Sequence, residues 1–93
     1  MSTESRAIPI LAEAGKLLAD DRKEVYGDAL HTCRRIGEVW AAQLDLPLPI
    51  PPHTVAAMMA GMKLIRSLIT PEHKDSWVDA AAYAALGFGT LSS

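Results

Sequence analysis

Apolar residues recur at every third or fourth position over four stretches of this chain, a spacing that places them on one face of an α-helix. The widest apolar face belongs to the third stretch and consists of Val55, Met58, Met59, Met62, Ile65, Leu68 and Ile69. The pattern predicts helices over about residues 8–20 and 28–43, a third from 53 or 54 to 69, and a fourth from 75 or 76 to 87–89. Four amphipathic helices predict an all-α protein with a compact, four-helix bundle-like domain.

Capping residues and prolines mark the predicted helix ends. Pro9 suits the first turn of a helix, and Asp28 is a favourable N-cap. Ser76 and Asp79 have the spacing of a capping box at the start of the fourth helix. Prolines dominate residues 47–52 and enforce a stiff, extended connection, whose apolar residues we expect to pack onto the helices.

Length and alanine content bear on how the chain is assembled. The 93 residues make one domain, 1–93, whose ends at 1–7 and 90–93 we expect to be flexible. Apolar residues make up 49% of the chain but aromatic residues only 5%, and the abundant alanine buries little area per residue. So thin a core favours a homo-oligomer, in which further copies supply the missing burial, over a small monomer.

Charge and cysteine content exclude several classes of protein. The formal net charge is −2, so we expect no binding to DNA or RNA polymers. The single cysteine, Cys33, excludes an internal disulfide and a cysteine-based zinc site, and its helical surroundings predict a buried thiol. No apolar stretch approaches the ~20 residues that span a bilayer, and the N-terminus lacks a signal-peptide pattern. We therefore expect no membrane partner and a cytoplasmic location.

Cations that could hold a phosphate gather in the last third of the chain. Lys63 and Arg66 are three residues apart and so project from one side of a helix. His73 and Lys74 lie in the turn that follows and could add donors to the same anion. The alternative is that Lys63 and Arg66 are surface cations or partners of carboxylates on the next helix, such as Asp79.

Aromatic residues near these cations could stack on a nucleobase. Trp77 and Tyr83 belong to the fourth helix, and Tyr26 lies in a basic, glycine-containing turn that also carries Arg22. A buried indole with its N–H hydrogen-bonded is the alternative for Trp77. The residues predicted to bind a ligand are therefore Arg22, Tyr26, Lys63, Arg66, His73, Lys74, Trp77 and Tyr83.

Acidic residues offer a second kind of chemistry. Asp75, Asp79 and Tyr83 follow one another at intervals of four and form a polar stripe on a helix that is otherwise almost wholly apolar. Carboxylate oxygens are the ligands that Mg²⁺ prefers, so these acids are candidates for a magnesium site. The candidate metal ligands are Asp75, Asp79 and Glu38, with Glu24 and Asp28 as further recruits.

These motifs resemble a family of short phage and prophage proteins known mainly as a domain of unknown function. The resemblance covers about residues 10–87, and its most specific part is the block Asp75-Ser76-Trp77-Val78-Asp79. The other residues that carry it are Asp21, Arg22, Tyr26, Gly27, Asp28, Arg35, Trp40, Lys63, Arg66, Pro71, His73, Ala81 and Tyr83–Leu86. The resemblance implies a location in the cytoplasm of the host cell.

More remotely, the chain is similar to all-α nucleoside triphosphate pyrophosphohydrolases of the MazG type in its size, helical layout and acid-bearing helices. Those enzymes pair Glu-x-x-Glu on one helix with Glu-x-x-Asp on a later one. Here the second helix has Glu38 alone, and the fourth has Asp75 and Asp79 at a spacing of four. The resemblance implies nucleotide binding, with about half of the metal set present.

The favoured interpretation is a phage-type, non-enzymatic protein that holds the phosphates of a nucleotide or cyclic-nucleotide signal. By analogy with small helical phage proteins that sequester immune signals, it would act as a sponge against host defence. This function needs no cofactor. One alternative is a MazG-like pyrophosphohydrolase that requires magnesium. A further alternative is a structural or protein-interaction module, in which the polar residues only tie the helices together.

Overall fold

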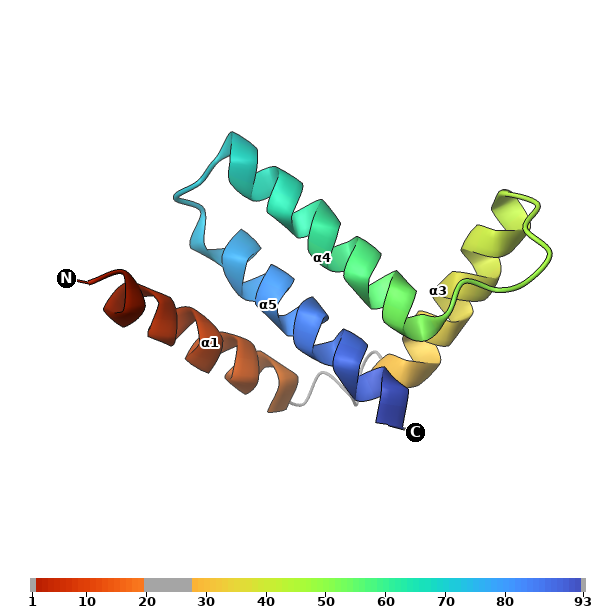
Figure 1. The fold of residues 1–93 in the computed structure, drawn as a ribbon, viewed down its shortest axis with the longest axis horizontal. Helices are drawn as coiled ribbons and strands as arrows, with labels where there is room; N and C mark the ends of the chain where they lie inside the picture. Colours follow the sequence, from red (N-terminus) through yellow and green to blue (C-terminus); the bar gives the residue numbers. More distant parts are fainter. Residues whose placement is uncertain (1, 20–27, 93) are drawn as a thin grey trace.

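The computed structural model describes residues 2–19 and 28–92, and over these residues the chain forms helices and no strand (Figure 1). The α-helices are α1 (Thr3–Ala19), α3 (Ala29–Gln43), α4 (Pro52–Ile69) and α5 (Lys74–Gly89), and a short 3-10 helix, η1 (Thr90–Ser92), follows α5. The predicted all-α class is confirmed. None of the described helices is long and apolar enough to cross a membrane.

Three helices lie side by side, and the remaining one crosses the end of this layer. α5 lies between α1 and α4 and packs against both, while α4 and α5 form an antiparallel hairpin (Figure 1). α3 packs against α4. The arrangement is more open than the compact bundle we expected, because the Cα radius of gyration is 14.5 Å, against about 12 Å for a compact domain of this length.

α1 begins earlier than predicted. Ser2 acts as its cap, because the Ser2 side chain accepts a hydrogen bond from the backbone N–H of Ser5 at 3.0 Å. Pro9 therefore lies inside the helix and not in its first turn, so this part of the prediction is wrong. The segment 3–7, where we expected a flexible end, belongs to α1.

The start of α3 is as predicted, whereas the connection to α4 differs in part. The Asp28 side chain accepts from the Leu30 backbone N–H at 3.1 Å and so caps α3. In the proline-rich connection, Ile50 is half-buried and its N–H donates to the Gly37 carbonyl at 3.2 Å. Leu48, which we expected to pack onto the helices, is exposed. Ile50 thus anchors this segment to α3, because its own N–H makes the hydrogen bond and the residue is half-buried.

α5 begins one or two residues before the predicted position, and its cap is different. His73 is the N-cap residue, and Ser76 is the third residue of the helix. The Ser76 hydroxyl is buried and contacts His73 Nδ1 at 2.9 Å, so it does not cap a backbone N–H as a capping box requires. Asp79 is the expected second member of the box, but its carboxylate forms an ion pair with Lys63 on α4.

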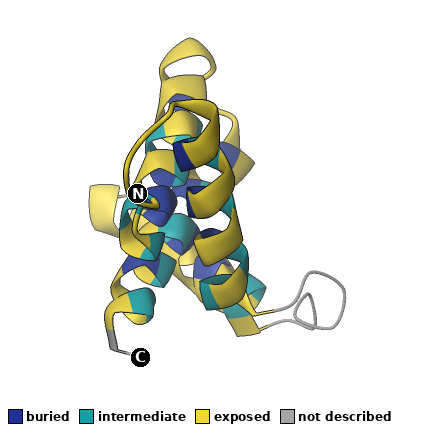
Figure 2. Cartoon of the chain, turned by 90° about the vertical axis from the view of Figure 1, so that its right-hand side faces the viewer, coloured by how far each residue is buried: buried dark blue, intermediate teal, exposed yellow. Residues whose placement is uncertain are grey.

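The core is divided between two small clusters. One joins α1 to α5 through Ala14, Val78 and Ala82, and the other joins α3 to α4 and is formed by Cys33, Val55 and Ala56. Buried residues lie between the helices, and exposed ones cover much of their outer sides (Figure 2). Alanine-rich clusters of this size bury little apolar area, so burial contributes little free energy to the packing of the described helices.

Candidate functional site

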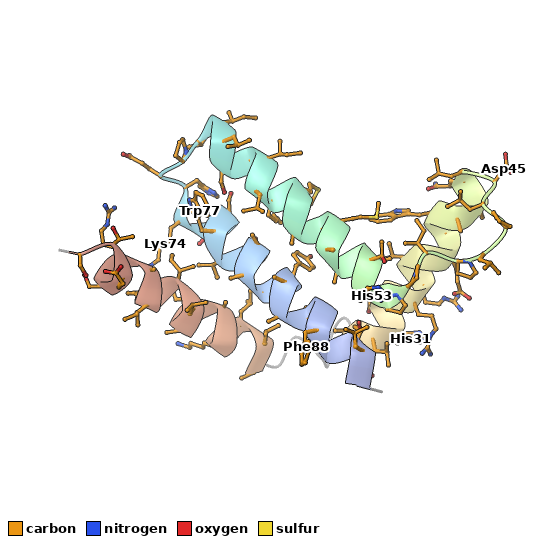
Figure 3. All side chains as sticks on the ribbon, viewed as in Figure 1. His31, Asp45, His53, Lys74, Trp77 and Phe88 are labelled. Carbon is orange, nitrogen blue, oxygen red and sulfur yellow. The ribbon has the colours of Figure 1, made fainter. Side chains whose placement is uncertain are left out.

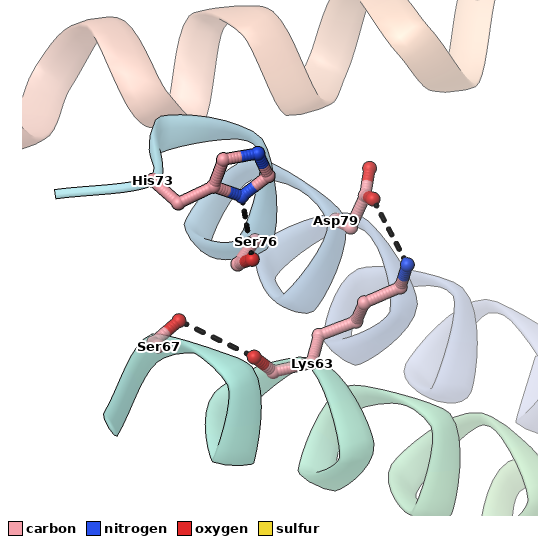
Figure 4. Close-up of polar contacts among 5 residues, drawn as sticks. All are labelled: Lys63, Ser67, His73, Ser76 and Asp79. Atoms are coloured by element: carbon pink, nitrogen blue, oxygen red, sulfur yellow. Dashed lines mark hydrogen bonds and ion pairs between the residues drawn. The ribbon is translucent and has the colours of Figure 1, made fainter. Parts of the chain in front are cut away.

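The α4–α5 hairpin carries most of the predicted site residues, and an ion pair crosses it. Lys63 Nζ on α4 lies 3.3 Å from Asp79 Oδ2 on α5, and the two side chains are 19% and 33% exposed (Figure 4). The alternative in which Lys63 is a partner of Asp79 is thereby confirmed. A partly buried pair ties the two helices together, and it leaves Lys63 already neutralised before any ligand arrives.

Two serines of the hairpin are buried near this ion pair. Ser67 and Ser76 are both almost fully buried, and Ser67 Oγ donates to the Lys63 carbonyl oxygen at 3.3 Å (Figure 4). Ser67 was not among the residues predicted from the sequence. The sequence did contain a signal for its burial, because Ser67 is a small polar residue within an apolar stretch of helix. Its hydroxyl can donate to a backbone carbonyl of the preceding turn, so the side chain can be buried between helices without an unpaired polar group.

Lys74 is also engaged by a carboxylate. Its Nζ lies 2.8 Å from Glu13 Oε2, so the start of α5 is linked to α1. The two side chains are 58% and 47% exposed, and a pair this accessible to solvent contributes little to stability. Sequence reasoning did not identify Glu13, because it lies 61 positions before Lys74 and only tertiary packing brings them together.

Trp77 and Arg66 both lie near the turn of the hairpin, but only Trp77 has a hydrogen-bond partner for its side chain in the described part of the chain. Trp77 lies near the start of α5 (Figure 3). Its indole N–H donates to the Pro71 carbonyl at 2.8 Å, and 42% of the residue surface is exposed. This hydrogen bond holds the ring in one orientation. Arg66 is exposed and, within residues 2–19 and 28–92, makes no ion pair or hydrogen bond with its side chain. Tyr83 is half-buried on α5 and likewise lacks a polar partner in that part of the chain.

The candidate metal ligands are not brought to one place. Glu38 lies on α3, where Arg35 Nε approaches its carboxylate at 3.9 Å, and Asp75 is exposed on α5. Within the described residues, no three His, Cys, Asp or Glu side chains are grouped as a metal ion would require. Asp28 serves as the cap of α3. The remaining candidates, Glu24, Arg22 and Tyr26, lie outside the described residues.

Cys33 is buried against the start of α4, as predicted. Burial raises the pKa of its thiol above the ordinary value, because the thiolate would lose its hydration. The thiol is therefore neutral at physiological pH and acts as a packed core residue.

The largest departure from the sequence analysis is the outward apolar side of α4. We name this side the outer α4 face. It consists of Ala57, Met58, Gly61, Met62, Leu64, Ile65, Leu68 and Ile69. Its six large side chains are between 44% and 81% exposed. Five of these residues belong to the apolar face that the periodicity predicts for this helix. In a bundle that face should point inward, whereas these five point outward. The smaller residues Ala56, Ala60 and Ser67 pack on the inward side instead, because small side chains let α5 approach more closely.

An open groove between α4 and the end of α5 adjoins the outer α4 face. It has a volume of about 500 Å³. Its lining is almost entirely apolar and consists of His53, Ala57, Ala60, Gly61, Leu64, Ala84, Gly87, Phe88 and Leu91. Phe88 and His53 mark its two sides in Figure 3. The groove extends the apolar surface from α4 onto the end of α5.

Comparison with known proteins places this chain in a family. The sequence profile of DUF6378, a domain of unknown function, matches residues 9–90. The chain belongs to the DUF6378 family. It is also 34% identical over 77 residues to the Gene 55 protein of Mycobacterium phage L5, an alignment that covers 83% of this chain and 49% of the phage protein. The chain thus spans about half the length of that relative.

The DUF6378 match includes both members of the Lys63–Asp79 pair and the whole outer α4 face. The expected phage-type family of unknown function is therefore confirmed, and the likeness to MazG-type enzymes stays a prediction. No solved structure matches the chain.

Proposed function

We propose that this DUF6378 protein is a non-enzymatic protein-interaction module that binds another polypeptide chain through the outer α4 face. The observation that carries the proposal is the exposure of six large apolar side chains on one side of a single helix. Soluble monomers rarely expose contiguous apolar patches of this kind, and larger ones usually mark interaction sites.

The free energy available at this surface is large for so small a chain. Moving a large apolar side chain from full exposure to full burial is worth about 1.5–3 kcal/mol. For six side chains that are already partly covered, the gain is on the order of 5–10 kcal/mol, before the entropic cost of association is subtracted. No comparable gain is available to the polar residues of the hairpin, because Lys63 and Lys74 are already paired within the chain.

Site-specific photo-cross-linking in cells tests this proposal. A photoreactive residue replaces Leu68 on the outer α4 face, and in a matched control it replaces Leu11, which is also an exposed leucine but lies on α1. We expect a discrete covalent adduct from position 68 and none from position 11. Equal adducts from both positions, or none from either, would show that the outer α4 face has no polypeptide partner.

A second candidate function is nucleotide binding near the hairpin turn, and the state of Trp77 favours it. Its N–H is satisfied by Pro71, so its ring is held in place while part of its surface is open to solvent. A pre-oriented aromatic ring loses little entropy when a base stacks on it. Arg66, one turn before the end of α4, has no partner in the described part of the chain and could meet a phosphate.

Thermal unfolding with nucleoside triphosphates, nucleoside monophosphates and cyclic dinucleotides tests this candidate. A ligand that binds only the folded state raises the melting temperature. We expect Trp77→Leu and Arg66→Gln to abolish the shift, and Lys16→Gln on α1 to leave it unchanged. A shift that survives in all three variants would place the ligand elsewhere. Pyrophosphate release in the presence of magnesium would instead support the enzyme alternative, for which the described residues offer no grouped set of ligands.

A further inference from the structure

Gly61 occupies the middle of α4 without a role in the packing of its own chain. A Cβ at this position would meet nothing within 4 Å. Gly37 differs, because a Cβ there would collide with the backbone carbonyl of Ile50. Glycine is an unfavourable residue inside a helix, so an internal glycine usually allows another backbone or side chain to come close. In the described part of the chain, nothing takes up the space beside Gly61.

The outer α4 face repeats with the spacing of a coiled-coil seam. Met58, Gly61, Ile65 and Leu68 are separated by three, four and three residues, as the a and d positions of a heptad are. The flanking positions are also apolar and hold Ala57, Met62, Leu64 and Ile69. Because neither the seam nor its flanking positions carry a charge, the partner helix that packs on them should also be apolar over a wide face.

We propose that the occupant of this face is a second copy of the chain, with the two α4 helices packed antiparallel about a two-fold axis level with Lys63. This proposal rests on the proposed function and names its partner. Positions 58 and 68 have 63 as their midpoint, and so do positions 61 and 65. A single two-fold axis level with residue 63 therefore pairs all four seam positions with those of the second copy. In that register, the partner's Ile65 fills the space beside Gly61, and the partner's Leu68 packs on Met58.

The antiparallel direction follows from side-chain size. In a parallel pair, each Gly61 would face the same glycine of the partner subunit and leave a gap in the middle of the seam. The antiparallel pair matches the smallest seam residue with a β-branched one, as close packing demands. It also places the two helix dipoles in opposite directions, which is favourable.

The surface of the chain is larger than a monomer of its mass needs. The accessible surface is 6841 Å² for a mass of 10.0 kDa, whereas a typical folded monomer of that mass exposes about 5,200 Å². The excess of about 1,600 Å² is summed over the whole chain, and it exceeds the ~800 Å² that each partner contributes to a standard interface. The six exposed apolar side chains of the outer α4 face contribute to this excess, and a homodimer through that face would bury them.

Disulfide cross-linking tests both the partner and the direction. In a Cys33→Ala background, the single variants Met58→Cys and Leu68→Cys are purified separately and then oxidised alone and as a mixture. An antiparallel dimer brings position 58 of one chain to position 68 of the other, so we expect covalent dimers from the mixture and almost none from either variant alone. Cross-links within each single variant would indicate a parallel pair and overturn the proposed geometry.

Light scattering on Gly61→Leu supplies the second measurement. The substitution adds apolar surface, so unspecific association would become stronger. In the proposed dimer it fills the space that the partner's Ile65 needs, and we expect the dissociation constant to rise at least tenfold. Gly15→Leu on α1 also meets open space and is the matched control, with no change expected.

The mass of the wild-type chain separates failure of this inference from failure of the proposed function. A monomeric wild-type chain at micromolar concentration overturns the homodimer. If position 68 still gives a photo-adduct whose mass is not that of two chains, the outer α4 face serves a different polypeptide and the proposed function stands. If that adduct is also absent, both are overturned.

Discussion

Breaking the Lys63–Asp79 pair measures how much of the hairpin's stability depends on charge. At 3.3 Å, two unit charges attract with about 1 kcal/mol in a water-like dielectric and about 5 kcal/mol at an effective dielectric constant of 20. The side chains are 19% and 33% exposed, and removing their hydration offsets part of this attraction. We therefore expect a coupling energy of about 1–2 kcal/mol, between the values typical of exposed and of fully buried pairs.

The assay is a double-mutant cycle on the free energy of unfolding. Lys63→Met, Asp79→Asn and the double variant are unfolded in urea and followed by far-ultraviolet circular dichroism. Each free energy of unfolding is obtained by linear extrapolation of the urea curve to zero denaturant. The protein concentration is kept constant throughout, because association would make the apparent stability depend on it.

The Lys74–Glu13 pair provides the control, because it is shorter but more exposed. Its coupling energy should be below about 0.5 kcal/mol, since solvent screens accessible charges. The reasoning is refuted if the Lys63–Asp79 coupling is below about 0.3 kcal/mol or does not exceed that of the control. Such a result would also free Lys63 for an anionic ligand and strengthen the nucleotide-binding candidate.

Three further predictions concern single residues. Gly37→Ala should lower the free energy of unfolding in urea by about 1–3 kcal/mol, because its methyl group collides with the Ile50 carbonyl, whereas Gly15→Ala should raise it by about 0.5–1 kcal/mol. Trp77→Phe should cost about 1 kcal/mol in the same assay, because it removes the indole donor. Cys33 has a raised pKa in the folded chain, so above about pH 8.5 the unfolded thiol ionises first and stability should fall with rising pH. Cys33→Ala should remove that slope.

Each of these predictions has a clear contradicting result. Equal stability of the Gly37 and Gly15 variants would mean that the proline-rich segment does not lie against α3. A Trp77 variant as stable as the wild type would mean that the indole hydrogen bond contributes nothing. A stability profile above about pH 8.5 that is unchanged by Cys33→Ala would assign the pH dependence to other groups.

Local patterns in the sequence were sufficient to locate the helices and to identify the cap of α3. Within residues 2–19 and 28–92, the apolar periodicity located α1, α3, α4 and α5, and Asp28 was identified as the cap of α3, because both signals act within one or two helical turns. The partnership of Lys63 with Asp79 was left open by the sequence as the alternative to phosphate binding, and only the structure selected it. Contacts between residues distant in sequence, such as Lys74 with Glu13, could not be derived in this way.

Residue pattern and composition alone predict an all-α chain with a thin, alanine-rich interior and one cysteine that packs inside it. Which side of α4 is buried depends instead on how the helices pack against one another. Apolar residues cover most of that helix, so its periodicity allows more than one inward face. The choice depends on Ala56, Ala60 and Ser67, whose small side chains let α5 come close, and packing against them leaves the larger Ile65 and Leu68 on the outside.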